Sequence, residues 1–379
     1  MTLREAVQRL LWTLTLAVLP WSPLVLMPYF SPWQAQAMWA QGWIIVLTGV
    51  WIASQARPIQ NRAVGTWLTM VCLVALMAWG EVMIRHKVYP AIRLMGVSHF
   101  LLLVLFYLAA TALLRPGTIA WLCRALAWSG ALMVAYGYLQ WANLDPLFKN
   151  MDWGAPDAVV GMIGNGTHFG TYLALLLPFF LARKGWGWIG CWLAALVLIA
   201  FTHSSTAYLM AFVLSVGMWW GKSRRVASWL LGVGLLVGVV AVAVHPRLLN
   251  LEGRWEAWTA FGRYANYNAV LGVGLGAVYD ISSTIEKTSP IYQWRHVHNE
   301  YYQLFIEQGF LGVGCFVGLV WSLTRRLRRL AWTWTQRTCA WVLVGFGLCS
   351  LTSYPAHLWA LGSLALFSYC SLIVLTEPI

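Results

Sequence analysis

Residues 298–323 read HNEYYQLFIEQGFLGVGCFVGLVWSL, a polar start followed by a continuous apolar run. A run of this length suits a membrane-spanning helix, which needs about 20 mainly apolar residues. Similar runs recur along the chain of 379 residues, which is 60% hydrophobic and only 10% charged, with a mean hydropathy of +0.67. Soluble domains carry roughly 25% charged residues. The sequence therefore predicts an all-α polytopic membrane protein, and continuous rather than alternating apolar runs disfavour a β-barrel.

We expect about twelve transmembrane helices in a single integral membrane domain that covers the whole chain, residues 1–379. The first apolar run extends from Leu10 to about Met27 without a cleavage motif close behind it, which favours an uncleaved span over a signal peptide. The longest polar stretch, residues 246–298, forms a large loop between the ninth and tenth spans. The predicted spans are 10–28, 37–54, 65–84, 98–114, 117–141, 169–182, 187–202, 205–220, 226–245, 300–323, 338–352 and 356–375.

The strongly basic short loops all fall on one side of this arrangement if the amino terminus is cytoplasmic. Cytoplasmic loops carry an excess of Lys and Arg, so the pattern places both termini in the cytoplasm. The loop 246–298 then lies outside, in the periplasm if the membrane is a bacterial inner membrane. The same pattern accounts for the net charge of +13 without a nucleic-acid partner. The basic residues concerned are Arg57, Arg62, Arg115, Arg183, Lys184, Lys222, Arg224, Arg225, Arg325, Arg326, Arg328 and Arg329.

One predicted outer loop, residues 85–97, breaks the rule because it carries Arg85, Lys87 and Arg93. Either a span is misplaced, or the loop simply tolerates these charges, or the cations are kept there to hold an anion. Guanidinium groups bind phosphate oxygens through paired hydrogen bonds, which would suit a cationic pocket at the outer face. The loop 246–298 would add Arg247, Arg254, Arg263, Lys287 and Arg295.

Several other kinds of site have no support in the sequence. The seven cysteines lie in or beside apolar spans without CxxC or Cys/His spacing, so we expect neither disulfides nor a structural zinc. Walker A, GxGxxG and HExxH motifs do not occur.

Three polar motifs interrupt the apolar pattern between residues 160 and 325. The first is GNGTHFGTYLALLLP at 164–178, where two glycines allow a turn and Thr167 is the expected helix cap. The second combines GRWEAWTAF at 253–261 with NAVLGVGLGAV at 268–278. The third is HNEYYQLFIEQGFLG at 298–312.

Together these motifs resemble the O-antigen ligase and O-antigen polymerase family of integral-membrane glycosyltransferases. The first is similar to the family's GN-x-N/H-x-x-G pattern, and the second to its R-x-x-x-W and P-L-x-G-x-G-x-G elements. The third is similar to H-N-x-x-L-x-x-x-x-E-x-G-x-x-G. The chain departs from the family in three places. The run THSSTAY at 202–208 lacks an arginine, Val270 stands where proline is usual, and Tyr302 replaces an aliphatic residue.

The resemblance implies a GT-C-like helical fold and a metal-independent glycosyltransferase without a cofactor. Such enzymes transfer a glycan from an undecaprenyl-pyrophosphate carrier to an acceptor hydroxyl at the outer face of the inner membrane. The implied partners are this lipid-linked donor, the lipid A-core of lipopolysaccharide or a glycan as acceptor, and membrane lipids.

A pyrophosphate leaving group needs cations more than a strong general acid, whereas a sugar hydroxyl that attacks needs a general base. His298 is the candidate base, since histidine accepts a proton near neutral pH; alternatively, it only bonds loop carbonyls at a helix start. His296 is a weaker candidate base and is expected to be structural. Arg254 is the leading phosphate-binding candidate, because it matches the family's loop arginine. Alternatively, it is a surface residue that pairs with Glu252 or Glu256.

The other candidates surround these two. Trp258 follows Arg254 by four residues and either stacks on a sugar or anchors the helix at the membrane interface. Glu307 is expected to make a structural hydrogen bond, and the glycines at 272, 274 and 276 to form a tight loop near the substrate. The complete predicted substrate-binding set is Arg254, Arg295, Arg85, Lys87, Arg93, Arg263, Trp258, Asn299 and Asn165, and no residue is predicted to bind a metal.

Within the family, the compact chain and the cationic outer face favour an O-antigen ligase of lipopolysaccharide biosynthesis, with an O-antigen or exopolysaccharide polymerase as the alternative. A protein O-oligosaccharyltransferase is a third possibility, although such proteins are usually longer. From other classes, a lipid-linked oligosaccharide flippase or a structural membrane protein remains open. Transporters favour internal repeats and charges in mid-membrane, whereas the polar residues of this chain collect at one face.

Overall fold

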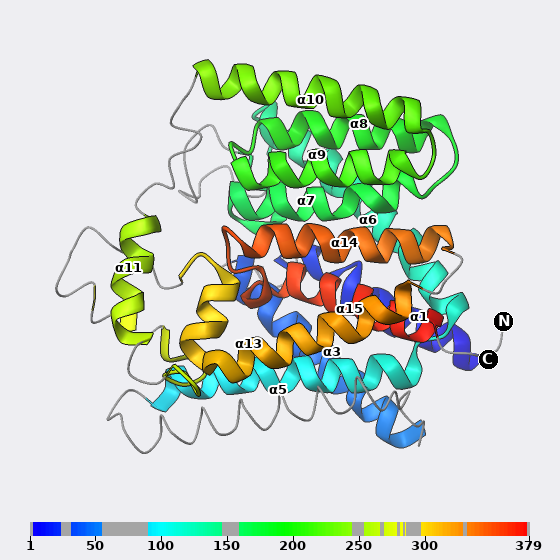
Figure 1. The fold of residues 1–379 in the computed structure, drawn as a ribbon. Coiled ribbons are helices and arrows are strands. Elements are labelled where there is room, and N and C mark those ends of the chain that lie inside the picture. Colours follow the sequence, from blue (N-terminus) through cyan, green and yellow to red (C-terminus); the bar gives the residue numbers. More distant parts are fainter. Residues whose placement is uncertain are drawn as a thin grey trace.

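The computed structural model describes residues 3–23, 32–54, 90–145, 159–244, 254–265, 269–278, 281–282, 285, 297–328 and 332–376. These residues form helices and connecting turns, and no β-strand occurs among them, in agreement with the predicted all-α class. The helices lie side by side in one bundle, and α11 packs across one end of it (Figure 1).

The helices follow the predicted spans closely. In chain order they are α1 (Leu3–Leu16), the 3-10 helix η1 (Leu19–Trp21), α3 (Pro32–Ser54), α5 (Pro90–Leu113), α6 (Pro116–Trp141), η2 (Gly161–Ile163), α7 (Gly166–Leu181), α8 (Trp186–Ala200), α9 (Ser205–Trp220), α10 (Arg224–Val244), α11 (Arg254–Ala265), α13 (Glu300–Leu327), α14 (Trp334–Ser350), η4 (Pro355–His357) and α15 (Trp359–Thr376).

The first predicted span differs from the structure. A continuous helix from residue 10 to residue 28 was expected, but α1 ends at Leu16 and η1 begins at Leu19. Pro20 explains the break, because in a continuous helix its ring would meet the carbonyl of Leu16, four residues earlier. The predicted span 65–84 lies outside the described residues.

Four of the described helices are long and apolar enough to cross a membrane: residues Gln34–Ser54 of α3, and the whole of α6, α13 and α15. Shorter apolar helices accompany them, namely Ser98–Leu113 of α5, α7, α8 and α9. The total of twelve crossings stays a prediction, as does the large outer loop at 246–298, of which the structure describes only parts.

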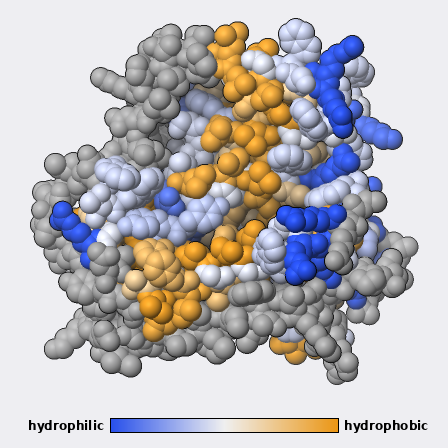
Figure 2. All heavy atoms as spheres, in the orientation of Figure 1, coloured by the Kyte–Doolittle hydropathy of each residue, from blue (hydrophilic) through white to orange (hydrophobic). Residues whose placement is uncertain are grey.

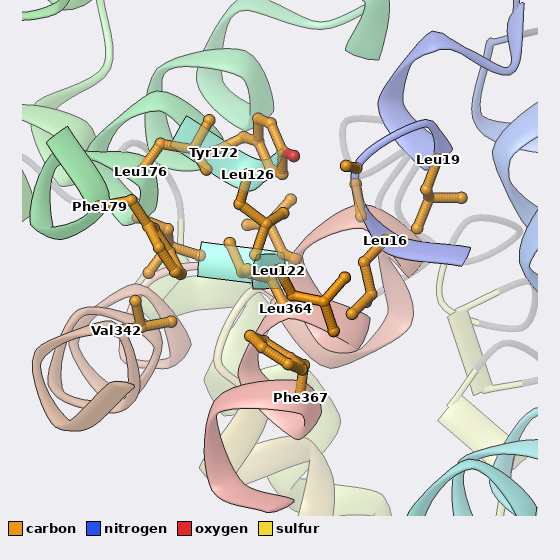
Figure 3. Packing of buried hydrophobic residues seen from close by; sticks show 14 of the residues in the cluster. Leu16, Leu19, Leu122, Leu126, Tyr172, Leu176, Phe179, Val342, Leu364 and Phe367 are labelled. Atoms are coloured by element: carbon orange, nitrogen blue, oxygen red, sulfur yellow. The ribbon is translucent and has the colours of Figure 1, made fainter. Parts of the chain in front are cut away.

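The core of the bundle centres on α7. Every residue of this helix from Phe169 to Leu181 is buried, because α6, α8, α9 and α14 surround it. Figure 3 shows side chains of α6, α7, α14 and α15 converging, among them Leu122, Phe179 and Phe367. The outer helices instead expose large apolar side chains, such as Trp229 of α10, which suits contact with lipid.

The two ends of the bundle differ in chemistry. Basic residues follow the end of α7 and occupy the last turn of α13, and hydrophilic side chains gather at the right edge of Figure 2, on the side where Figure 1 marks both termini. The starts of α7 and α13 lie at the opposite end. They lie close together there: His168 of α7 and His298, just before α13, both contact Tyr354. We call this the histidine end.

Candidate functional site

The turn between α14 and α15, residues 351–358, organises the histidine end. Polar side chains of four helices, α5, α7, α9 and α13, contact this turn. His99 of α5 donates to the carbonyl of Ala356 (2.9 Å), and the hydroxyls of Thr206 in α9 and Thr352 are 2.6 Å apart. This turn, named here the α14–α15 turn, therefore fixes the relative positions of helices that are distant in sequence.

His298 faces this turn. Its ring lies perpendicular to the ring of Tyr354, with 5.0 Å between the centroids. On the other side, the Tyr354 hydroxyl lies 3.3 Å from Nε2 of His168. His298 has a left-handed backbone (φ 55°), which turns the chain just before Asn299 caps α13. The predicted base is thus held at a helix start, only partly buried, beside two other polar rings.

Glu300, in the first turn of α13, binds the same turn. One carboxylate oxygen accepts from the backbone N–H of Ala356 (3.2 Å), and the other lies 3.1 Å from Nδ1 of His357. The ring of His99 stacks on the His357 ring, with 5.9 Å between centroids. One carboxylate of α13 therefore fastens both the backbone and a side chain of the α14–α15 turn.

The network continues along α13 through two buried side chains, Gln303 and Glu307. The side-chain nitrogen of Gln303 lies 3.2 Å from Nε2 of His357 and 3.3 Å from Oε1 of Glu307. Glu307 is buried, and its hydrogen bond to Gln303 agrees with the structural role predicted for it. A buried carboxylate is costly unless it has such partners.

His357 makes the stability of the histidine end depend on pH. Burial lowers its pKa, but the charge and hydrogen bond of Glu300 and the charge of Glu307 outweigh that effect and raise the pKa from 6.5 to about 9, with neutral His99 stacked alongside. A folded state that keeps this proton is stabilised fully below pH 6.5 and loses the contribution as pH rises to about 9. We expect the thermal unfolding midpoint in detergent to fall across this window.

The variant Glu300→Gln should flatten that pH dependence, because the carboxylate that holds the proton on His357 is gone. Glu5→Gln, at an exposed position of α1, is the matched control and should keep the wild-type slope. Equal slopes in Glu300→Gln and wild-type protein would contradict the assignment.

The second and third motifs meet at a break in α13. Gly309 has a non-helical backbone (φ 63°, ψ −163°), which frees backbone groups on either side of it. Residues 269–278, the glycine loop, satisfy these groups. Val273 and Gly274 donate to the carbonyls of Ile306 (2.8 Å) and Glu307 (3.0 Å). The N–H groups of Phe310 and Leu311 donate to the carbonyls of Ala269 (2.8 Å) and Val270 (3.2 Å).

The glycines of the loop are needed for this close approach. Gly272, Gly274 and Gly276 all have positive φ angles, of 76°, 110° and 77°. A Cβ atom on Gly272 would lie 2.4 Å from the backbone carbon of Glu307. The predicted tight loop is therefore present, and its close backbone neighbour is α13.

α11 supports the backbone next to His298. The Trp258 indole donates to the carbonyl of Val297 (2.8 Å), and the Tyr302 hydroxyl donates to the carbonyl of Trp258 (3.1 Å). A small apolar cluster that includes Phe261 and Ile306 joins the two helices. Tyr302, a departure from the family pattern, thus has a hydrogen-bonding role that an aliphatic residue could not fill.

We expect Trp258→Phe to destabilise this end by about 1–3 kcal/mol, because the buried carbonyl of Val297 loses its donor. Thermal unfolding in detergent measures the loss. Trp255→Phe is the matched control, since Trp255 lies on the same helix but is 69% exposed. If both variants unfold at the wild-type temperature, the indole bond does not hold the loop.

The two predicted asparagines cap helices. Asn299 accepts from the N–H of Tyr302 (3.0 Å) at the start of α13, and Asn165 accepts from the N–H of His168 (3.1 Å) at the start of α7. The prediction that Thr167 caps the second of these helices was wrong. The helix begins at Gly166, so Thr167 already lies within it, and Asn165 has the extended backbone of a capping residue.

The structure describes only some of the predicted cationic residues. Arg254 is the first residue of α11, one turn before Trp258, and Arg263 is exposed in the last turn of that helix. The expectation that Arg93 lies in a loop at 85–97 was wrong, because α5 already begins at Pro90; Arg93 lies six residues or about 9 Å along the helix axis before His99. The side chains of Arg254 and Arg93 lie outside the described part of the structure, as do the whole residues Arg85, Lys87 and Arg295.

Several polar residues of this end were not among the predicted site residues, among them His99, His168, Tyr354 and His357. His168 lies within the first motif, and the run TSYPAH at 352–357 is a polar interruption between two apolar spans. Both stretches can be recognised in the sequence, but the sequence does not show that they contact each other in the folded protein. No group of three or more His, Cys, Asp or Glu residues arranged for a metal ion occurs within the described residues.

Comparison with known families adds an independent observation. Residues 189–317 match the family model described as O-antigen ligase. This part of the chain is similar to the O-antigen ligase family. The O-antigen ligase match confirms the resemblance, and it contains α11, the glycine loop and His298 but begins after the first motif. No curated protein sequence matches the chain significantly.

Together, the match and the apolar helices describe a multi-pass membrane protein of the O-antigen ligase or polymerase type. That family implies a lipid-linked glycan and an acceptor as substrates.

Proposed function

We propose that this protein is an O-antigen ligase, which transfers a glycan from undecaprenyl pyrophosphate to a hydroxyl of lipid A-core. The observation that carries the proposal is the position of His298. It lies in the matched segment, at the start of α13, where α11 and the glycine loop both support the same helix. A titratable side chain fixed at one end of an apolar bundle is suited to chemistry at a membrane face.

His298 serves as the general base. Its imidazole takes the proton from the acceptor hydroxyl while that oxygen forms a bond to the anomeric carbon of the donor glycan. The bond between this carbon and the pyrophosphate oxygen breaks, and undecaprenyl pyrophosphate leaves with the electron pair. The protonated His298 then releases its proton to water. No metal or cofactor is required in this scheme.

The departing pyrophosphate gains negative charge, which cations must stabilise. Arg254 is the proposed principal contact, with Arg295, Arg263 and the basic segment at residues 85–93 as further cations. The described ends of α11 and α5 support this assignment. α11 packs against the start of α13, and His99 of α5 contacts the α14–α15 turn.

We expect Arg254→Ala to weaken donor binding, and Arg254→Lys to restore it only in part, because a point charge cannot replace a planar guanidinium fork. The measurement is the Michaelis constant for donor glycolipid in proteoliposomes. Arg224→Ala, at the opposite end of the bundle, is the control and should behave as wild type. Unchanged donor dependence in Arg254→Ala would remove this residue from the site.

We further propose that the protein lies in a bacterial inner membrane with both termini in the cytoplasm and the histidine end in the periplasm. The basic residues in the last turn of α13, at the end of the bundle opposite the histidine end, support this orientation. The compact chain and its cationic outer segments favour lipid A-core over another lipid-linked repeat as the acceptor.

The surface-glycan profile of a deletion strain tests the function. Loss of a ligase leaves bare lipid A-core and accumulates long glycan on the carrier. Loss of a polymerase instead leaves single repeats attached to the core, and that result would assign the alternative function. If carrier-linked repeats accumulate on the cytoplasmic side of the membrane in the deletion strain, the protein is a flippase and the ligase proposal fails.

A further inference from the structure

Tyr354 is the residue that brings the histidine end together around His298. Its ring meets the ring of His298 at 89° and the ring of His168 at 77°, with centroid distances of 5.0 and 5.4 Å. Its hydroxyl also makes the contact with Nε2 of His168. One aromatic side chain thus lies between histidines that are 130 residues apart in the chain (298 − 168).

The backbone that carries Tyr354 is held firmly. Ala356, two residues later, has its N–H bound to Glu300 and its carbonyl bound to His99. Two residues earlier, the hydroxyl of Thr352 binds that of Thr206. The ring is therefore presented to His298 by a turn that three helices restrain, which is what a side chain needs to fix the orientation of a neighbour.

We propose that Tyr354 is a positioning residue for His298, whose ring orients the imidazole for proton transfer. This inference rests on the proposed function of His298 as the base. The two rings meet edge to face, and such a contact holds one ring at a defined angle to the other, so the tyrosine ring limits how the imidazole can turn. A base must also lie within hydrogen-bonding reach of the proton it removes, and a misplacement of about 1 Å costs about 10²-fold in rate.

The hydroxyl of Tyr354 has a different partner from the ring, which allows the two parts to be separated. The hydroxyl contacts His168, whereas the ring edge or face contacts His298. Phenylalanine keeps the ring and removes the hydroxyl. Alanine removes both.

The experiment compares Tyr354→Phe and Tyr354→Ala in proteoliposomes, with carrier-linked glycan extracted from the deletion strain as donor. We expect Tyr354→Ala to lower kcat by about 10- to 100-fold with little change in KM, and Tyr354→Phe to keep most of the wild-type kcat. Tyr208→Ala, which removes a partly exposed tyrosine at the start of α9, is the control for general loss of an aromatic ring. Equal losses in the Phe and Ala variants would overturn the inference, because the hydroxyl rather than the ring would then matter.

A second measurement does not depend on transferase activity. Diethyl pyrocarbonate modifies neutral imidazole, and mass spectrometry of the peptide that contains His298 gives its rate at each pH. We expect Tyr354→Ala to raise the rate for His298 several-fold, because the ring that covers the imidazole is gone, while Tyr354→Phe matches wild type. A wild-type profile in Tyr354→Ala overturns the positioning role. If labelling changes as expected but the wild-type protein transfers no glycan, the proposed function fails and the contact between the rings stands.

Discussion

Replacing His298 with alanine should lower glycan transfer by about 10²- to 10⁴-fold, the usual contribution of a positioned general base. Of the histidines that the structure describes near His298, His168 contacts the Tyr354 hydroxyl and His357 is bound to Glu300, so both are engaged by other groups. Complementation of the deletion strain shows the effect as bare lipid A-core in the surface-glycan profile. Detergent-solubilised His298→Ala should still unfold cooperatively, because the N-cap of α13 comes from Asn299.

His203→Ala provides the matched control. His203 also has a left-handed backbone (φ 52°) and lies in the turn between α8 and α9, but it is exposed. Both variants therefore remove a histidine from a left-handed position in a turn, but only His298→Ala removes the proposed base. A normal glycan profile with His298→Ala, or an equal defect with His203→Ala, would be incompatible with His298 as the base.

The positions of the helices were largely predictable from the sequence, because apolar runs of sufficient length have few alternatives. The predicted span 205–220 coincides with α9, and the predicted spans 187–202 and 226–245 differ from α8 and α10 by two residues or fewer at each end. Two runs in the described part of the chain differ most. In the first, hydropathy does not show that Pro20 breaks the helix after Leu16. The helix predicted at 98–114 begins at Pro90, because residues before the apolar run, including Arg93, also belong to α5.

The candidate site was predictable only where its residues are close in sequence. His298, Asn299 and the glycine loop were identified from local motifs, and α13 does begin where the third motif predicts. The role of Tyr354 and His357 depends instead on contacts between the α14–α15 turn and helices more than 50 residues away. Hydrophobic periodicity carries no information on such contacts. The break of α13 at Gly309 was likewise not predicted, because hydropathy indicates one uninterrupted span at 300–323.

The variant Gly309→Ala should disrupt the whole site although Gly309 lies eleven residues after His298. Its backbone angles are ones that only glycine adopts readily, and another residue there costs about 1–3 kcal/mol in strain alone. The added Cβ would also lie 2.3 Å from the carbonyl oxygen of Val270. Neither α13 nor the glycine loop can yield without losing hydrogen bonds, so we expect a lower unfolding temperature and severe loss of transfer.

Gly314→Ala is the internal control for this prediction. Gly314 lies five residues later on the same helix, and a Cβ atom there would meet nothing within 4 Å. Alanine is the better helix former by about 1 kcal/mol, so this variant should be as stable as wild type or more so. If Gly309→Ala also retains wild-type stability and activity, the break in α13 is not required. If Gly309→Ala unfolds earlier while the nearby control does not, the cause is the docking of the glycine loop rather than glycine content, because both substitutions add the same methyl group to one helix.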